Sequence, residues 1–130
     1  MTLVGWADDW WDFSPVQKLI LQTVVVVLAV GSGLCLEVTG SAVLDGLLTG
    51  IWLIWICNAF NVLDMEDGLA AGVGALSALG LGFLGLLGES PPLFGLALTF
   101  VGGFGGFLIH NFHPARIYMG DNGSLFSGFL

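Results

Sequence analysis

The sequence predicts an all-α membrane protein, a polytopic helical bundle, on three observations. The chain of 130 residues is 56% hydrophobic and only 9% charged, whereas soluble domains carry about 25% charged residues. Its apolar residues form four uncharged runs of 18 to 21 residues. A helix of about 20 residues crosses a hydrocarbon core of about 30 Å, and backbone groups in lipid must be paired within their own segment. We therefore expect four transmembrane helices, at 19–36, 46–63, 68–88 and 91–109.

The two later spans are rich in glycine, which weakens a soluble helix but lets membrane helices approach closely. Small residues four positions apart are typical of such contacts. The pairs Gly46/Gly50 and Gly102/Gly106 have this spacing. We therefore expect the second and fourth spans to pack tightly against neighbouring helices.

Several protein classes do not fit the sequence. Residues 6–12 carry three aspartates where a signal peptide needs basic residues. The net charge of −8 argues against nucleic-acid binding. Cys35 and Cys57 lie in apolar runs without zinc-site spacing, so we expect both to be buried small hydrophobic residues. A transporter or channel stays open as an alternative, although it would place charges within its spans and these four have none.

The charged residues are distributed unequally between the two ends of the spans. Four crossings would place stretches 1–18, 64–67 and 110–124 on one face, with both cations, Lys18 and Arg116, and seven of the ten carboxylates. The positive-inside rule makes this face cytoplasmic. Such crowded carboxylates favour a divalent cation such as Mg²⁺, which prefers oxygen ligands and bridges to substrate phosphates. Solvated carboxylates at helix ends are the simpler alternative.

The first candidate motif is Asp8-Asp9-Trp10-Trp11-Asp12. On a helix, Asp8 and Asp12 would share a face because they are four residues apart. One carboxylate could then face a metal or phosphate while another orients it. Alternatively, the motif is a solvated charge cluster at a helix end, stopped by Ser14-Pro15, with its tryptophans anchored at the membrane interface.

The second candidate motif, residues 58–69, places polar residues at every third position. At that spacing neighbouring members share one edge of a helix and could line a cavity wall. Hydrogen bonding between helices, with a cap on the following helix, is the alternative. The polar positions are Asn58, Asn61, Asp64 and Asp67.

The third candidate motif, residues 111–125, contains Asp121-Asn122 with a glycine on each side. This composition predicts a tight turn that presents the Asp121 carboxylate from exposed backbone. Tyr118 lies three residues earlier and offers a flat face for a nucleotide base. A turn, a helix cap and an aromatic anchor would explain the same residues without a site.

In this order and on one membrane face, the three motifs resemble the polyprenyl-phosphate N-acetylhexosamine-1-phosphate transferase family (glycosyltransferase family 4). Residues 58–69 and 111–125 are its most specific matches, and Asp12 with the Asn-Phe-His-Pro-Ala-Arg run is more similar to the GlcNAc branch than to the muramoyl branch. The chain departs from the family at Asp64-Met65-Glu66-Asp67, where the family has Asp-Gly-hydrophobic-Asp, so the local turn is expected to differ. Because family members have ten or eleven spans, four spans would correspond to an interior part of the fold.

The resemblance implies transfer of N-acetylglucosamine-1-phosphate from UDP-GlcNAc to undecaprenyl phosphate, with release of UMP. By the same resemblance, this reaction would serve cell-envelope polysaccharide synthesis at the cytoplasmic side of the plasma membrane. The partners would be a nucleotide sugar, a polyprenyl phosphate and the membrane, without nucleic acid, and a homodimer stays open. The alternatives are a phospho-MurNAc-pentapeptide transferase or a membrane fragment without catalytic activity.

The resemblance also implies roles for single residues. Asp8 would accept a proton from the lipid phosphate or orient it, and Asp9 would support the metal region as the second catalytic residue. Mg²⁺ would be held by Asp121 and Asn61. The expected substrate-binding residues are Asp12, Asn58, Asp64, Asp67 and Tyr118, with Tyr118 stacked on uracil.

Overall fold

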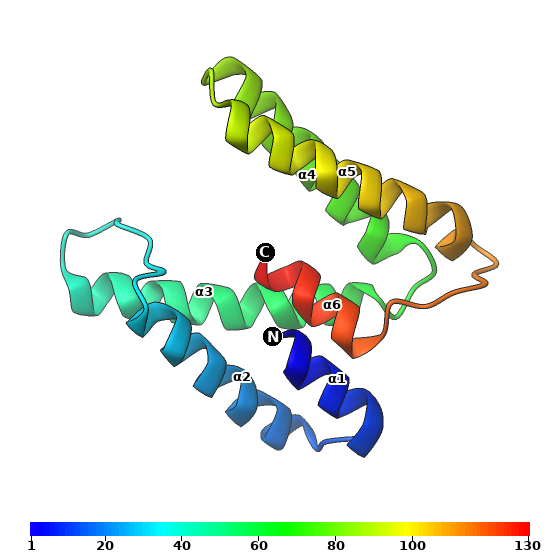
Figure 1. The fold of residues 1–130 in the computed structure, drawn as a ribbon. Coiled ribbons are helices and arrows are strands. Elements are labelled where there is room, and N and C mark those ends of the chain that lie inside the picture. Colours follow the sequence, from blue (N-terminus) through cyan, green and yellow to red (C-terminus); the bar gives the residue numbers. More distant parts are fainter. The chain divides into compact units, whose positions relative to one another are not determined.

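All regular secondary structure of the chain is helical in a computed structural model that describes residues 1–130 (Figure 1), which confirms the all-α prediction. Three helices, α3, α4 and α5, are long and apolar enough to cross a membrane, and α2 is a shorter apolar helix. The helices are α1 (Thr2–Trp11), α2 (Pro15–Gly31), α3 (Ala42–Leu63), α4 (Leu69–Leu87), α5 (Pro91–Asn111) and α6 (Gly120–Phe129).

The bounds of α2 differ most from the predicted span at 19–36. The helix begins at Pro15 because Ser14 and Gln17 form a capping box ahead of a proline in the first turn. It ends at Gly31, well before the apolar run ends. Cys35 is therefore in the following loop and exposed, so its predicted burial is wrong, whereas Cys57 is buried as expected.

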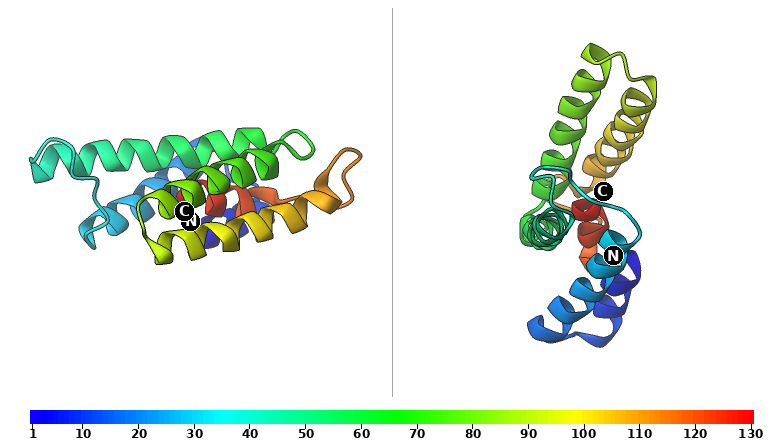
Figure 2. Two further views of the ribbon diagram at one scale, coloured as in Figure 1. Left: turned by 90° about the horizontal axis from the view of Figure 1, so that it is seen from above. Right: turned by 90° about the vertical axis from the view of Figure 1, so that its left-hand side faces the viewer.

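The chain divides into two units, and the first contains residues 1–62 and 119–130. Here α6 lies along α1, close to α3, and both chain ends of the unit lie near each other (Figure 2). Its buried core contains Val4, Cys57 and Leu125, from three different helices. A Cβ at Gly128 would lie 2.6 Å from the Cα of Cys57. The approach of α6 to α3 therefore requires a residue without a side chain at position 128.

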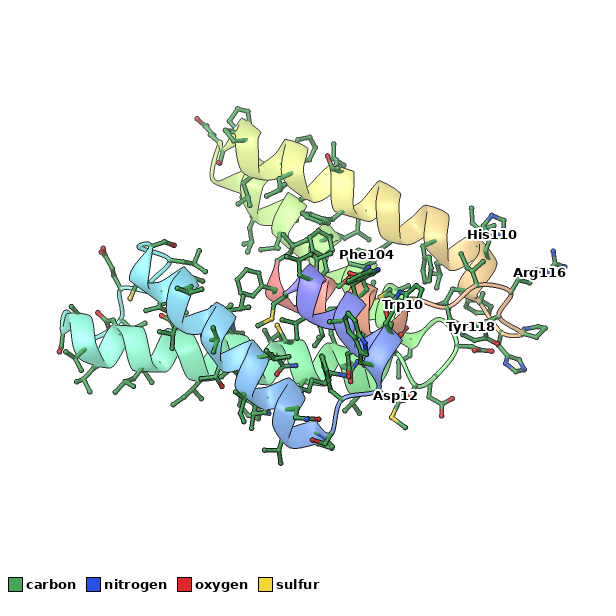
Figure 3. All side chains as sticks on the ribbon, turned by 60° about the horizontal axis from the view of Figure 1, so that its bottom comes forward. Trp10, Asp12, Phe104, His110, Arg116 and Tyr118 are labelled. Carbon is green, nitrogen blue, oxygen red and sulfur yellow. The ribbon has the colours of Figure 1, made fainter.

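A glycine on α4, but not the glycine pair on α5, allows these two helices to pack closely. In the second unit, residues 63–118, α4 and α5 form an antiparallel hairpin (Figure 2). A Cβ at Gly74 would lie 2.8 Å from the Phe104 ring, labelled in Figure 3, so α4 supplies this close approach. The predicted packing role of Gly102 and Gly106 is wrong within this hairpin, because a Cβ at either position would meet no atom within 4 Å.

The other small-residue pair behaves as predicted. A Cβ at Gly46 would lie 3.3 Å from Val30, and one at Gly50 would lie 3.5 Å from Val26. These contacts bring α3 against α2. The polar ends of α2 and α3 are thereby placed at the same end of the first unit.

Candidate active site

A pocket of about 480 Å³ lies in the first unit, where the polar ends of its helices converge. Its walls come from α1 and the α1–α2 connection, the first turn of α2, the last turns of α3 and the first turn of α6. The lining residues are Asp8, Asp9, Asp12, Phe13, Pro15, Lys18, Asn58, Asn61 and Asp121.

Lys18 joins the four helices electrostatically. Its Nζ lies 2.7 Å from Oδ2 of Asp8, 2.5 Å from Oδ2 of Asp121 and 3.3 Å from Oδ1 of Asn61. The Lys18 side chain is only 13% exposed. Three oxygens from three helices therefore converge on one ammonium group, and the charge-assisted hydrogen bonds that Lys18 donates to them hold them close together.

Asp8 is held from both of its oxygens. Oδ1 accepts a hydrogen bond from the backbone N–H of Phe13 at 2.9 Å, and Oδ2 faces Lys18. The residue is 6% exposed. Burial raises the pKa of Asp8, and the neighbouring Asp121 raises it further, against the opposing effect of Lys18. A carboxylate with a raised pKa accepts a proton more readily than an ordinary one.

Asp121 is the more stabilised anion of the pair. Burial raises its pKa, but its interactions with Asp8, with the Lys18 ammonium and with the Asn61 amide outweigh that effect, and the net pKa lies below the usual value. The Asn61 amide donates to Oδ1 of Asp121 and, at 3.0 Å, to the hydroxyl of Ser124. Asp8 and Asp121 thus lie on the same cation with pKa values displaced in opposite directions, a pattern found at functional sites.

Asn58 is the next pocket residue along α3, one turn before Asn61. Its amide donates to Oε1 of Gln22 at 2.7 Å and to the backbone oxygen of Ile54 at 2.8 Å. Gln22 is fully buried. This pair links α2 to α3 within their apolar portions, where an unpaired amide would be costly.

Asp12 corrects one sequence expectation. Helix α1 ends at Trp11, and Asp12 follows in a left-handed conformation with φ of 44°. Asp8 and Asp12 therefore do not share a helical face, because the chain turns sharply between α1 and Ser14 (Figure 3). Asp12 still lines the pocket, from the connection rather than from the helix.

The second motif is divided between the two units. Asn58 and Asn61 lie on α3, but the helix ends at Leu63, so the expected single polar edge does not continue to Asp64 and Asp67. The Met65-Glu66 sequence instead lies in a turn before α4. The substrate-binding role of Asp64 stays a prediction.

Asp67 holds the loop after α5. It accepts a hydrogen bond from the backbone N–H of Ala115 at 3.0 Å and lies 3.0 Å from Nδ1 of His113. The Ala115 N–H, followed by His113, lowers the pKa of Asp67. Tyr118, in the same loop, is 74% exposed (Figure 3). The proposed contacts of Asp67 and Tyr118 with the nucleotide sugar stay predictions.

The third motif forms a helix start rather than an isolated tight turn. Gly120 has a φ of 66°, and Asp121 lies in the first turn of α6. The backbone N–H groups of Asp121 and Asn122 donate to Oδ1 and Oδ2 of Asp9, at 2.9 and 3.1 Å. The expectation of a presented carboxylate holds, but a helix terminus presents it.

Sequence reasoning missed three residues of this site. Lys18 was used only to orient the protein in the membrane, although it is the single lysine of a chain with ten carboxylates. Its place in the first turn of an apolar helix was a usable signal. Gln22 and Ser124 carried no signal, because their roles depend on partners from distant segments.

The carboxylate and amide oxygens of the pocket are of the chemical type that a hard divalent cation prefers. No group of three or more His, Cys, Asp or Glu side chains is arranged to hold a metal. The carboxylates of Asp8 and Asp121 and the amide oxygen of Asn61 nevertheless already converge on one cation. Mg²⁺ is commonly bound by one or two carboxylates with substrate phosphates and water completing its shell. Asp121 and Asn61 would hold it.

The whole chain, residues 1–130, matches the family model described as glycosyl transferase family 4. A probable undecaprenyl-phosphate N-acetylglucosaminyl 1-phosphate transferase of Bacillus subtilis is 34% identical over 98% of this chain and 38% of its own length. Phospho-N-acetylmuramoyl-pentapeptide-transferases of a Synechococcus strain and a Synechocystis strain are 40% and 35% identical, over 95% and 96% of this chain and 41% and 40% of theirs.

This chain spans about two fifths of the length of these relatives. No solved structure matches it. The family model nevertheless covers every residue, including all three motifs and the helices that bring Asp8, Asn61 and Asp121 together. The chain therefore belongs to glycosyl transferase family 4.

Proposed function

We propose that the protein containing this chain transfers a hexosamine-1-phosphate from a nucleotide sugar to a polyprenyl phosphate, and that the pocket around Lys18 forms part of its active site. The observation that carries the proposal is the convergence of Asp8, Asp121 and Asn61 on the Lys18 ammonium. Relatives from two branches with this general chemistry support it. Lys18 is a largely buried cation held between two carboxylates. Its ammonium group could bind the oxygens of a phosphate substrate.

In the proposed reaction, an oxygen of the lipid phosphate attacks the phosphorus attached to the sugar. A new P–O bond forms there while the bond to the UMP oxygen breaks, and UMP leaves. If the lipid phosphate carries a proton, Asp8 accepts it, which its raised pKa favours. Lys18 binds phosphate oxygens, and Asn58 and Asn61 orient them from α3. Chemistry of this kind depends mainly on positioning and on neutralising charge.

Mg²⁺ is the proposed cofactor, and it would supply charge neutralisation of the diphosphate when bound. Asp121 and Asn61 are its proposed ligands. The low pKa of Asp121 keeps that carboxylate anionic at neutral pH, as a metal ligand must be.

For the sugar, we propose N-acetylglucosamine, with UDP-GlcNAc as donor and undecaprenyl phosphate as acceptor. The B. subtilis relative and the similarity of the Asn-Phe-His-Pro-Ala-Arg run to the GlcNAc branch support this choice. The muramoyl-pentapeptide donor is the competing substrate, supported by relatives of comparable identity.

The donor test measures UMP release from membranes that contain the protein, with undecaprenyl phosphate and either donor. We expect release with UDP-GlcNAc and at least tenfold less with UDP-MurNAc-pentapeptide. Membranes without the protein and reactions without lipid phosphate are the controls. The reverse preference would assign the protein to the muramoyl branch, and no release with either donor would contradict the transferase proposal.

We also propose that the protein lies in the plasma membrane and that its pocket faces the cytoplasm. Single cysteines at Asp12, Glu66 and Asn122 should react with a membrane-impermeant thiol reagent in inverted vesicles but not in intact cells. The parent for these variants has Cys35 replaced by serine, because that cysteine is exposed. A cysteine at Glu89, predicted on the opposite face, is the matched control and should label only from outside. Labelling of any of the first three from outside would contradict this topology.

A further inference from the structure

Asp9 makes contacts unlike those of its neighbour Asp8. Successive residues on a helix point in directions about 100° apart. Asp8 therefore reaches Lys18 while Asp9 reaches the start of α6, where its two oxygens accept the backbone N–H groups of Asp121 and Asn122. The residue at the N-terminal boundary of α6, Met119, offers no side-chain cap.

The first N–H groups of a helix have no partner within that helix. A carboxylate is the favoured partner, both as acceptor and because it opposes the positive end of the helix dipole. Asp9 supplies this cap from a segment more than a hundred residues away in sequence. The cap lies on the amide of Asp121 itself, so it fixes the backbone from which the proposed metal ligand projects.

Gly5 also contacts the start of α6, next to the cap that Asp9 provides. It lies one helical turn before Asp9, on the same face of α1. A Cβ at Gly5 would lie 2.5 Å from the Cα of Asn122 and 2.6 Å from its N, and it would also overlap the backbone oxygen of Asp121. Gly120 also favours this contact between α1 and α6. A Cβ at Gly120 would lie 3.3 Å from the Asp9 carboxylate, and the φ of Gly120 is 66°, a conformation that glycine adopts readily.

We infer that Asp9 and Gly5 act together as a positioning device, a seat on α1 that sets the position of Asp121 relative to Asp8 and Lys18. Asp9 then takes no part in proton transfer and binds no metal. It acts through the α6 backbone, and Gly5 acts by allowing that backbone close enough to be capped. This inference rests on the proposed function for the reaction that the positioned carboxylate serves.

Asp9→Asn tests the cap with a small change. An amide offers only one acceptor atom, so its NH₂ group would face one of the two α6 N–H groups. We expect kcat for UMP release to fall about 10- to 100-fold, because displacement of a reacting group by about 1 Å costs up to 10²-fold. The KM for the nucleotide sugar should change less than about threefold, and the pH dependence of kcat should keep its shape. Loss of one limb of the pH profile would show that Asp9 transfers a proton and would overturn the positioning role.

Gly5→Ala tests the same seat without touching any charge. It should lower kcat in the same way, and the double variant Gly5→Ala/Asp9→Asn should be no worse than about threefold below the more damaged single variant, because both displace the same backbone. Gly31→Ala, with no atom within 4 Å of the added Cβ, and Glu37→Gln, an exposed carboxylate, are the matched controls. Multiplicative losses in the double variant would overturn the shared seat.

Hydrogen exchange of the purified protein provides a readout that needs no turnover. The amides of Asp121 and Asn122 should exchange at least tenfold faster in both Asp9→Asn and Gly5→Ala than in the wild type, while the amides of α4 stay unchanged. Unchanged exchange, or faster exchange with normal kcat, would overturn the positioning role and leave the proposed function intact. A wild-type protein without turnover would overturn the proposed function, and the positioning role with it.

Discussion

Asp121→Asn is expected to abolish transfer, with UMP release reduced about 10³-fold or more. Both oxygens of Asp121 accept hydrogen bonds, one from Lys18 and one from the Asn61 amide. In the variant one of these atoms becomes an NH₂ donor and faces another donor. The variant also loses the negative charge on which a hard divalent cation depends. A loss of 10³-fold corresponds to about 4 kcal/mol in the activation barrier, the size expected for lost charge stabilisation.

The measurement is Mg²⁺-dependent release of UMP by membranes that contain each variant at matched expression. Asp8→Asn should also be severe but should leave binding of the nucleotide sugar intact, because its proposed partner is the lipid phosphate. Glu89→Gln, in the turn between α4 and α5, should keep nearly normal turnover. Near-normal turnover by Asp121→Asn would remove the metal assignment. Equal damage from Glu89→Gln would remove the idea of a site at one membrane face.

Lys18→Met is expected to have the second large effect, on stability as well as on transfer. The ammonium lies between Asp8 and Asp121, and its removal leaves two facing carboxylates without a counter-charge. Breaking a largely buried ion pair in this way typically costs about 3 kcal/mol. We expect the free energy of unfolding of the first unit to fall by about 2–3 kcal/mol, with transfer reduced at least 10²-fold because phosphate oxygens lose their partner.

Thermal unfolding in detergent, with and without Mg²⁺, measures the stability effect. Adding Asp8→Asn to Lys18→Met should recover part of the lost stability, because it removes the like-charge contact. Mg²⁺ should stabilise Lys18→Met more than the wild type, since a cation can then take the ammonium's place. Arg116→Met, which removes the chain's other cation from an exposed position, should change stability by less than about 0.5 kcal/mol. Equal destabilisation by both variants would contradict the central role of Lys18.

The sequence by itself determined the fold class and the family resemblance of the three motifs. In a bilayer the backbone N–H and C=O groups of a long uncharged run must be hydrogen-bonded within the run itself, which requires a helix. The helices α3, α4 and α5 could therefore be predicted from composition and length. The order Asp8, Asn61, Asp121 was readable too, because the motifs are local and specific. Local signals also explain the start of α2, since Ser14 and Gln17 form a capping box and Pro15 occupies the first turn, all of which the sequence contains.

Only the tertiary structure decided which polar residues meet. The Asp8–Lys18–Asp121 contact joins positions up to 113 residues apart, and no periodic pattern encodes a pairing of that range. The same holds for Gln22 with Asn58. The positions of Asp12 and Asp67 could not be predicted from helical spacing. Helix α1 ends one residue before Asp12, and helix α3 ends four residues before Asp67.

The division of labour between Asp8 and Asp9 shows the reason most clearly. The two residues are chemically identical and adjacent, so the sequence could only group them as catalytic. In the structure, Asp8 is buried, with 6% of its surface exposed, and contacts Lys18. Asp9 instead caps the N-terminus of α6. The sequence supplies the carboxylates, but the angle between neighbouring side chains and the approach of a distant helix through Gly5 decide what each carboxylate contacts.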